Sequence, residues 1–191
     1  MIDDRLLIKQ VKEGNKDAFR QLVVIHHQRV IHICMSFVNH LVDAEDVAQE
    51  VFVEVFKSVS SYREEASLST WLYRLAVNKS LDYLRQKKRK KRGYGVLSTM
   101  ENAELANLSV VDSDDVSQEL ELEERKRILL MAMDKLPERQ RVALSLSKLD
   151  ELPQKEVAEI MSVSEGSVES LLVRAKKKLK EILMQQKQEI L

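Results

Sequence analysis

Residues 154–175 read QKEVAEIMSVSEGSVESLLVRA and predict two short helices joined by a tight turn. In the first helix Val157, Ala158 and Met161 recur at helical spacing and form an inward face. The small side chain of Ala158 lets a second helix cross closely. Residues 162–164 form the turn, and a serine at its end is well suited to cap the next helix, because its hydroxyl accepts a free backbone N–H. The pattern indicates a helix-turn-helix.

The second helix of this pair presents a polar and basic outward face. It buries Val168, Leu172 and Ala175. In a helix-turn-helix the second helix enters the major groove of DNA, and basic side chains beside it attract phosphates. A plain helical hairpin with a solvated basic face is the alternative. The outward residues, predicted to bind DNA, are Ser167, Glu169, Ser170, Arg174, Lys176, Lys177 and Lys178.

The remainder of the chain also reads as helices, and no convincing strand is present. The 191 residues contain four glycines and two prolines, too few for the turns of a sandwich fold. Gly14 ends a first helix, Asn15 is expected to cap the second, and Asp43 is expected to cap the third. From 44 to 59 an apolar stripe includes Phe56. We therefore predict an all-α fold.

The charges divide the chain into three blocks. Residues 1–92 carry 17 Lys or Arg against 12 Asp or Glu, residues 93–124 carry none against nine, and residues 125–191 carry 14 against 10. Basic ends suggest polyanionic partners, although solvated helix faces would look the same. We predict an N-terminal helical domain over 1–92, a flexible acidic linker over 93–118 and a helix-turn-helix domain over 119–191.

Several classes of protein are disfavoured. Cys34 is the single cysteine, so a disulfide framework is impossible. No apolar run approaches the roughly 20 residues that span a bilayer, and we expect a cytoplasmic protein without membrane insertion. His26, His27, His32 and His40 do not share one face with Cys34 at metal-ligand spacing. No nucleophile with its base and no phosphate loop stands out, so we expect no metal, no cofactor and no enzyme activity.

The helix predicted from 44 to 59 has a second, polar face. Asp46, Gln49, Glu50 and Val53 follow helical spacing and point away from the apolar stripe. Such a face can bind a partner helix, with Val53 as an apolar contact. A solvated helix surface is the alternative interpretation.

A third set of residues surrounds the polar loop that ends near Ser69. Tyr62, Arg63, Asn78 and Lys79 combine an aromatic ring, cations and an amide. These groups suit single-stranded DNA, because rings stack on bases and cations bind phosphates. Burial in the core is the alternative for the apolar residues nearby, and we expect it for Trp71, Leu72 and Leu75.

Three segments, in order, resemble those of extracytoplasmic-function sigma factors. Residues 43–52, DAEDVAQEVF, resemble their polymerase-binding region. Residues 69–78, STWLYRLAVN, resemble their −10 region, and residues 136–141, LPERQR, together with the helix-turn-helix, resemble their −35 region. The likeness is weaker at Glu169, where the family often has a basic residue.

The resemblance implies a promoter-recognition subunit without chemistry of its own. It implies that Asp46, Gln49, Glu50 and Val53 bind core RNA polymerase. It further implies that Tyr62, Arg63, Asn78 and Lys79 bind the melted −10 strand, that the last helix reads duplex −35 DNA, and that an anti-sigma factor is a partner. An ordinary helix-turn-helix regulator and an interaction protein that sequesters partners are the alternatives.

Overall fold

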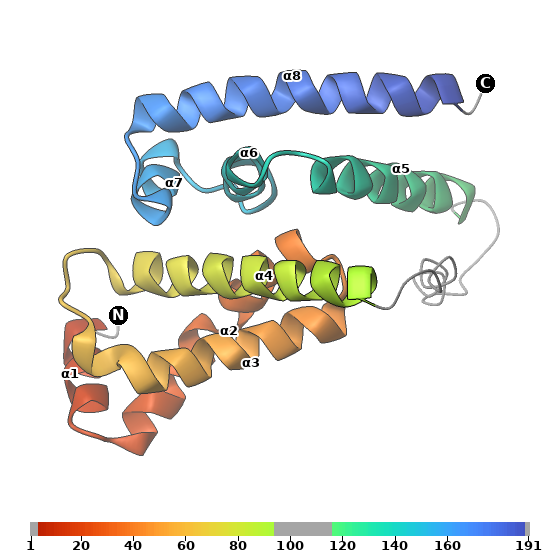
Figure 1. Ribbon diagram of the computed structural model, residues 1–191. Coiled ribbons are helices and arrows are strands. Elements are labelled where there is room, and N and C mark those ends of the chain that lie inside the picture. Colours follow the sequence, from red (N-terminus) through yellow and green to blue (C-terminus); the bar gives the residue numbers. More distant parts are fainter. Residues whose placement is uncertain (1–3, 94–115, 190–191) are drawn as a thin grey trace.

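The computed structural model describes residues 4–93 and 116–189, and within these ranges every element is a helix (Figure 1). The all-α prediction is confirmed. The predicted linker over 93–118 lies mostly outside the described residues. The helices are α1 (Asp4–Lys12), α2 (Lys16–Val38), α3 (Leu41–Ser58), η1 (Val59–Ser61), α4 (Leu68–Gly93), α5 (Val116–Asp134), α6 (Glu138–Leu144), the π-helical turn η3 (Ser145–Leu149), α7 (Gln154–Met161) and α8 (Glu165–Glu189).

The starts of α2 and α3 show how local chemistry sets the helix ends. Asn15 caps α2 as predicted, since its side chain accepts the N–H groups of Asp17 and Ala18 at 2.9 and 3.1 Å. The prediction that Asp43 caps α3 is wrong. His40 holds that position and accepts the N–H of Asp43 at 3.4 Å. The Asp43 carboxylate is thereby free to accept a hydrogen bond from Lys87 of α4, at 3.1 Å.

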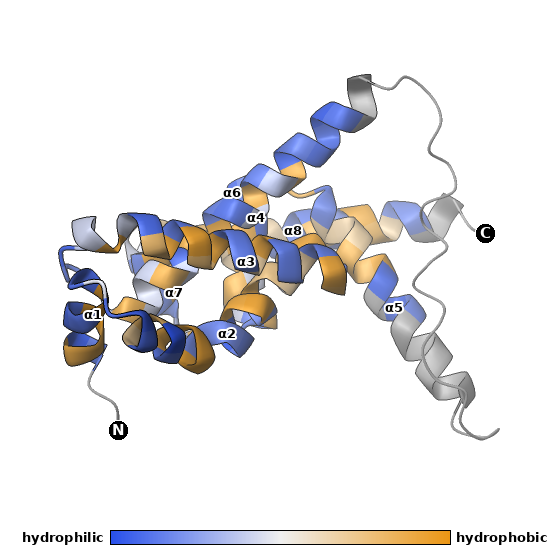
Figure 2. Cartoon of the chain, turned by 90° about the horizontal axis from the view of Figure 1, so that it is seen from below, coloured by the Kyte–Doolittle hydropathy of each residue, from blue (hydrophilic) through white to orange (hydrophobic). Residues whose placement is uncertain are grey.

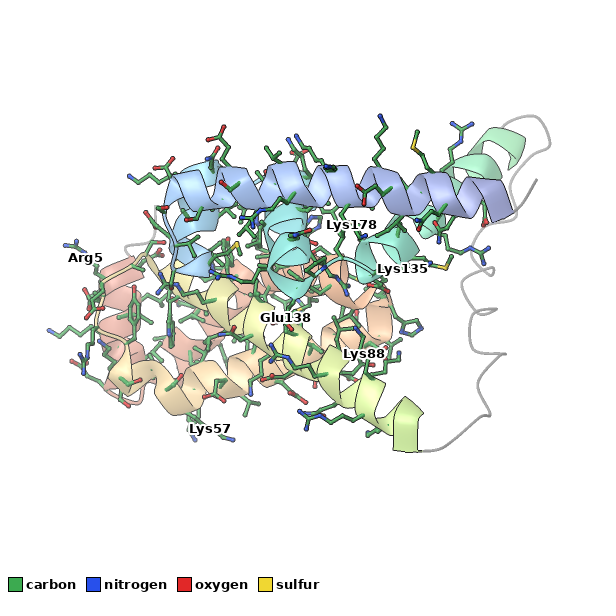
Figure 3. The ribbon with its side chains drawn as sticks, turned by 45° about the horizontal axis from the view of Figure 1, so that its top comes forward. Arg5, Lys57, Lys88, Lys135, Glu138 and Lys178 are labelled. Atoms are coloured by element: carbon green, nitrogen blue, oxygen red, sulfur yellow. The ribbon has the colours of Figure 1, made fainter. Side chains whose placement is uncertain are left out.

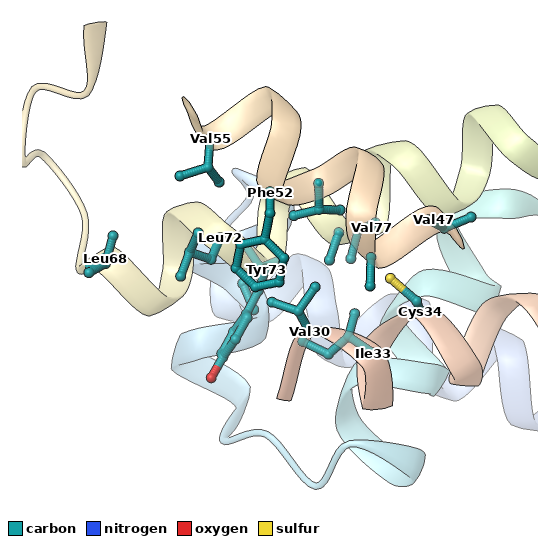
Figure 4. Close-up of a cluster of buried hydrophobic side chains, with 14 of the residues drawn as sticks. Val30, Ile33, Cys34, Val47, Phe52, Val55, Leu68, Leu72, Tyr73 and Val77 are labelled. Atoms are coloured by element: carbon teal, nitrogen blue, oxygen red, sulfur yellow. The ribbon is translucent and has the colours of Figure 1, made fainter. Parts of the chain in front are cut away.

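The N-terminal core lies between α2, α3 and α4, which all contact one another. Figure 4 shows part of this cluster, with Ile33 and Cys34 of α2 close to Val47 of α3 and Val77 of α4. One residue that the sequence placed on the buried stripe lies outside it, because Phe56 is 59% exposed. Its position at the edge of the α3 stripe directs the ring towards solvent, so this part of the prediction is wrong.

The C-terminal helices form a second cluster around α8. Ala132 and Met133 of α5 and Leu144 of α6 pack with Ala175 and Ile182 of α8. Pro137 separates α5 from α6, as expected from its missing N–H. In Figure 1, α8 lies over α5, α6 and α7 along its length. No helix within residues 4–93 and 116–189 is long and apolar enough to cross a membrane.

The two halves of the chain pack directly against each other. The buried N-terminal cluster continues into Leu146, Leu152, Val157 and Val168 without interruption. The helices that meet are α7 with α4 and η3 with α2. In Figure 2 the body is continuous, whereas the last, hydrophilic turns of α4 project beyond it. We call this contact between the halves the seam.

Asp150 lies in the seam as a buried carboxylic acid. Its side chain is fully buried, its Oδ2 accepts a hydrogen bond from the Ser36 hydroxyl at 3.2 Å, and its Oδ1 lies 3.5 Å from Nε2 of His32. Burial raises the pKa of Asp150 from 3.8 to about 6, and the charges of His32 and Arg29 and the Ser36 hydrogen bond offset only part of this effect. The ionised form is therefore the costly one in the folded protein.

This pKa predicts how stability changes with pH. Because the pKa of Asp150 is higher in the folded than in the unfolded protein, the protonated side chain favours the folded state. This contribution to stability is fully present below pH 4 and is lost as the pH rises through about 6. Asp150→Asn removes the charge and keeps the shape. We expect it to increase the free energy of unfolding at pH 7.5 by up to about 3 kcal/mol, with the gain shrinking towards pH 4. Urea unfolding at both pH values measures this.

The matched control is Glu151→Gln, which removes the same charge from the exposed neighbouring residue. We expect it to change the free energy of unfolding little at either pH. A lower stability of Asp150→Asn than of the wild type at pH 7.5 would show that the ionised carboxylate stabilises the seam.

Candidate interfaces for protein and nucleic acid

The outer side of α3 borders an apolar groove. The groove has a volume of ≈ 430 Å³ and lies between α2 and α3. Of the predicted partner-binding residues, Gln49 and Val53 line it, whereas Asp46 and Glu50 are exposed on the same helix without lining it. The other lining residues are Phe19, Val23, His27, Phe52 and Phe56.

Aromatic side chains give the groove its shape. The rings of Phe19 and Phe56 meet edge to face with centroids 5.3 Å apart, and His27 stacks on Phe52 at 6.3 Å. Val53 is 52% exposed. Exposed apolar side chains grouped in a concave site are typical of protein-binding surfaces. We did not predict from the sequence that Phe56 belongs to this surface. Phe56 follows Val53 by three positions, so the helical spacing from Gln49 to Val53, continued by one step, would have indicated it.

Tyr62 has a structural role in the loop before α4. Its ring stacks on Trp71 with centroids 4.8 Å apart, and its hydroxyl donates a hydrogen bond to the Ala66 carbonyl at 2.6 Å. Lys12 donates a hydrogen bond to the Tyr62 carbonyl at 2.8 Å and places its ammonium 5.5 Å from the ring centroid. The pair of rings is thus held in place beside Arg63, which is exposed.

Asn78 and Lys79 lie further along α4. Asn78 follows Trp71 by seven helical positions, or roughly 10 Å, and its side chain is exposed. Lys79 forms an ion pair with Glu54 of α3 at 3.2 Å. The structure therefore brings Tyr62 and Trp71 together, while Asn78 presents a separate amide on the same helix.

The end of α4 carries exposed cations. Lys88, Arg89 and Lys90 are exposed (Figure 3 labels Lys88), and the charge of Lys88 acts on Asp134 of α5, where it opposes the raising of that carboxyl's pKa by burial. Lys87 is different, since it contacts Asp43 and lies 5.7 Å from the centroid of the Tyr83 ring. Burial alone would raise the pKa of Asp43, but hydrogen bonds from Tyr83 and Lys87 and the charge of Lys87 hold it below its usual value.

The helix-turn-helix forms as predicted. Ser162 adopts a left-handed conformation with φ 53°, and its N–H donates to the carbonyls of Ala158 and Glu159 at the end of α7. Ser164 caps α8, because its hydroxyl accepts the N–H of Ser167 at 3.2 Å. Gln154 donates to the Glu165 carbonyl at 2.9 Å and ties α7 to the start of α8.

The outward side of α8 is free for a ligand. All seven predicted residues are exposed: Ser167, Glu169, Ser170, Arg174, Lys176, Lys177 and Lys178. Arg174 donates to the Ser170 carbonyl at 3.1 Å, and Lys178 lies 3.5 Å from Glu181. Within the described part of the chain Glu169 has no ion pair and no side-chain hydrogen bond, so its exposed carboxylate is not neutralised by direct contact.

Two family profiles match the chain in the order of these surfaces. Sigma-70 region 2 matches residues 22–90, and sigma-70 region 4 matches residues 126–179. The ECF RNA polymerase sigma-E factor of Haemophilus influenzae is 33% identical over 177 residues, which are 92% of this chain and 92% of that protein.

Solved structures agree with this relationship. The structure of CnrH in complex with the cytosolic domain of CnrY matches with a TM-score of 0.64 at 25% identity, covering 94% of this chain and 96% of that one. The sigma factor RpoE in complex with the anti-sigma factor NepR from Bartonella quintana matches with a TM-score of 0.59, covering 87% of this chain and 96% of that one. At 20% identity, the second likeness shows the fold alone.

Family profiles on both halves and a relative of more than 30% identity across most of the chain lead to one assignment. The chain belongs to the extracytoplasmic-function group of sigma-70 factors, non-enzymatic proteins that direct RNA polymerase to promoters.

Proposed function

We infer that this sigma factor uses three separate surfaces: the α2–α3 groove for core RNA polymerase, the start of α4 for the melted −10 element, and the outward side of α8 for the −35 element. The observation that carries the proposal is the groove, because it combines exposed aromatic rings with the predicted residues Gln49 and Val53. The corresponding domains are 1–92 and 119–191, with 93–118 as the linker.

The groove suits a helical partner. Its floor is apolar, and the neighbouring carboxylates of Asp46 and Glu50 are exposed on the same helix. A partner helix with apolar anchors and flanking cations would bury Phe56 and Val53 and pair with both acids. This arrangement supports polymerase binding by a defined surface rather than by charge alone.

The start of α4 suits unpaired bases. The Tyr62–Trp71 stack is a ring pair that is already ordered, beside the exposed Arg63 and followed by the exposed Asn78. Stacking and an amide that bonds a base edge are the usual means of holding single strands. Lys79 is expected to bind phosphate only after it leaves Glu54, to which it is paired.

Two further proposals rest on relatives. CnrH and RpoE are both seen in complexes, the second with a protein named as an anti-sigma factor. We expect an anti-sigma factor to bind this chain as well, and we expect the chain to act in the cytoplasm, where core polymerase is found.

The overall proposal is tested by reconstitution. Core polymerase, the purified protein and a DNA library with randomised −10 and −35 elements are mixed, and initiating sequences are selected. We expect specific initiation only when both proteins are present. DNA binding by the chain alone, without any effect on polymerase, would instead indicate an ordinary helix-turn-helix regulator.

Polymerase binding is predicted to depend on α3. The double variant Asp46→Arg with Gln49→Ala should lose at least roughly tenfold in affinity for core polymerase, because it reverses a charge and removes a groove amide. The control is Asp17→Arg with Gln21→Ala, which makes the same changes at exposed positions of α2 that do not line the groove. Circular dichroism verifies that both variants keep their helicity. Equal binding by the two would contradict the assignment.

Promoter melting is predicted to depend on Asn78. Asn78→Ala should weaken open-complex formation and leave affinity for core polymerase unchanged, since its amide is exposed on α4. Permanganate footprinting of the bubble measures the effect. Gln86→Ala, which removes another exposed amide of α4, is the control and should leave the bubble intact. A normal bubble with Asn78→Ala would reject the role.

Glu169 is predicted to read a base of the −35 element. Its unpaired carboxylate can accept a hydrogen bond from N4 of cytosine, a contact worth about 1–3 kcal/mol of discrimination. Glu169→Gln and Glu169→Arg are compared on a randomised −35 library, with affinity and preference scored separately. We expect the preferred base to change at one position. A uniform rise in affinity over all sequences would show that Glu169 only repels phosphate.

A further inference from the structure

The loop between η1 and α4 is tied to α1 by one side chain. Residues 62–67 have no helical structure, and α1 contacts η1 directly before them (Figure 1). Lys12 is the last residue of α1. Its Nζ donates to the Tyr62 carbonyl at 2.8 Å, lies 5.5 Å from the centroid of the Tyr62 ring and lies 3.8 Å from Oε1 of Glu64. One cation therefore holds the first residue of the loop by both its backbone and its ring.

The packing of α1 fixes the position of Lys12. Ile8 and Val11 of this helix are buried in the N-terminal core. Soon after Lys12 the chain turns at Gly14, whose φ of 83° lies in the left-handed region, and the Gly14 N–H donates to the Val11 carbonyl at 3.0 Å. The ammonium thus reaches the loop from a helix end that is itself held in place.

The loop needs contacts at both of its ends. At the far end the Tyr62 hydroxyl reaches the Ala66 carbonyl, and the hydroxyl of Ser67 caps α4. Between these points Glu64 has a φ of 59°, a conformation that is unfavourable for a residue with a side chain. Such a conformation persists only where the surrounding contacts impose it. Lys12 supplies the contact at the N-terminal end of the loop.

We propose that Lys12 is a positioning residue of the −10 site: it holds Tyr62, and with it the stacked ring of Trp71, in the arrangement that receives an unpaired base. The inference rests on the proposed use of this loop and of Asn78 for the melted −10 element. A site that is ordered beforehand loses less conformational entropy when the strand binds. Lys12 lies outside residues 22–90, which the region 2 profile matches, so a helix beyond that segment takes part in the site.

Lys12 acts through the backbone and ring of Tyr62 more than through the charge of Glu64. The hydrogen bond to the carbonyl is short and is donated by a charged group, which strengthens it. The ion pair with Glu64 is longer, at 3.8 Å, and the Glu64 side chain is 46% exposed. Ion pairs of this exposed kind contribute little. Removing the charge of Glu64 should therefore not replace Lys12.

The variant Lys12→Met tests the role in two states of the protein. In the free protein Trp71 is the single tryptophan, so its fluorescence reports directly on the ring stack, and we expect acrylamide to quench it more strongly in the variant. In the holoenzyme the probe is a fork DNA whose −10 bases are already unpaired, taken from a promoter selected with the wild type. We expect affinity for this fork to fall roughly three- to tenfold, with affinity for core polymerase unchanged.

Two variants serve as controls. Lys9→Met makes the same change at an exposed position of α1 and should match the wild type in both measurements. Lys12→Arg keeps a cation that donates hydrogen bonds and should recover most of the affinity for the fork. Circular dichroism verifies that all variants keep their helicity. Wild-type quenching and wild-type affinity in Lys12→Met would overturn the proposal.

The double variant Lys12→Met with Glu64→Gln separates positioning from simple neutralisation of charge. It should bind the fork as weakly as Lys12→Met alone. Recovery of wild-type affinity in the double variant would overturn the proposal, because it would show that Lys12 only neutralises Glu64.

Asn78→Ala on the same fork separates this inference from the function on which it rests. A loss of affinity with Asn78→Ala but none with Lys12→Met would refute the role of Lys12 and leave the −10 site in place. No loss with either variant would refute the proposed site as well.

Discussion

The rest of this structure depends on one apolar contact, the seam. There α7 packs against α4, and η3 packs against α2. It brings residues of both halves into one buried cluster, since Leu152 and Val157 are buried with Leu72 and Phe37, while the cluster around α8 stays separate. It also buries Asp150 and Arg141, groups that are costly to remove from water unless they are paired. The same contact decides which surfaces stay exposed.

Those exposed surfaces are divided by function. The groove beside α3 and the outward side of α8 are accessible in this structure, while Arg74 and Arg85 of α4 are bound by the other half. The structure thus leaves the groove accessible, whereas two arginines of α4 are paired with the other half of the chain.

The sequence predicted most of the local structure and little of the seam. The helix-turn-helix was predictable because Ser164 is a strong cap and Val168 and Ala175 fall on one face. Asp43 was misassigned because His40, a weaker capping residue by type, lies three residues earlier and accepts the N–H of Asp43 itself. Phe56 was misassigned because it lies at the edge of the stripe, where periodicity does not decide between core and groove. The burial of Asp150 and Arg141 could not be predicted from the local pattern, because both lie in contacts with the other half of the chain.

The distance between the two halves in the free protein tests the central claim, the packing of the seam, most directly. Spin labels on cysteines at Gln21 of α2 and Gln185 of α8, both exposed and outside the proposed binding surfaces, allow that distance to be measured by double electron–electron resonance. Because the seam joins the halves into one body, the account predicts a single short distance with a narrow distribution in the free protein. A broad distribution that extends to distances tens of ångströms longer would contradict it.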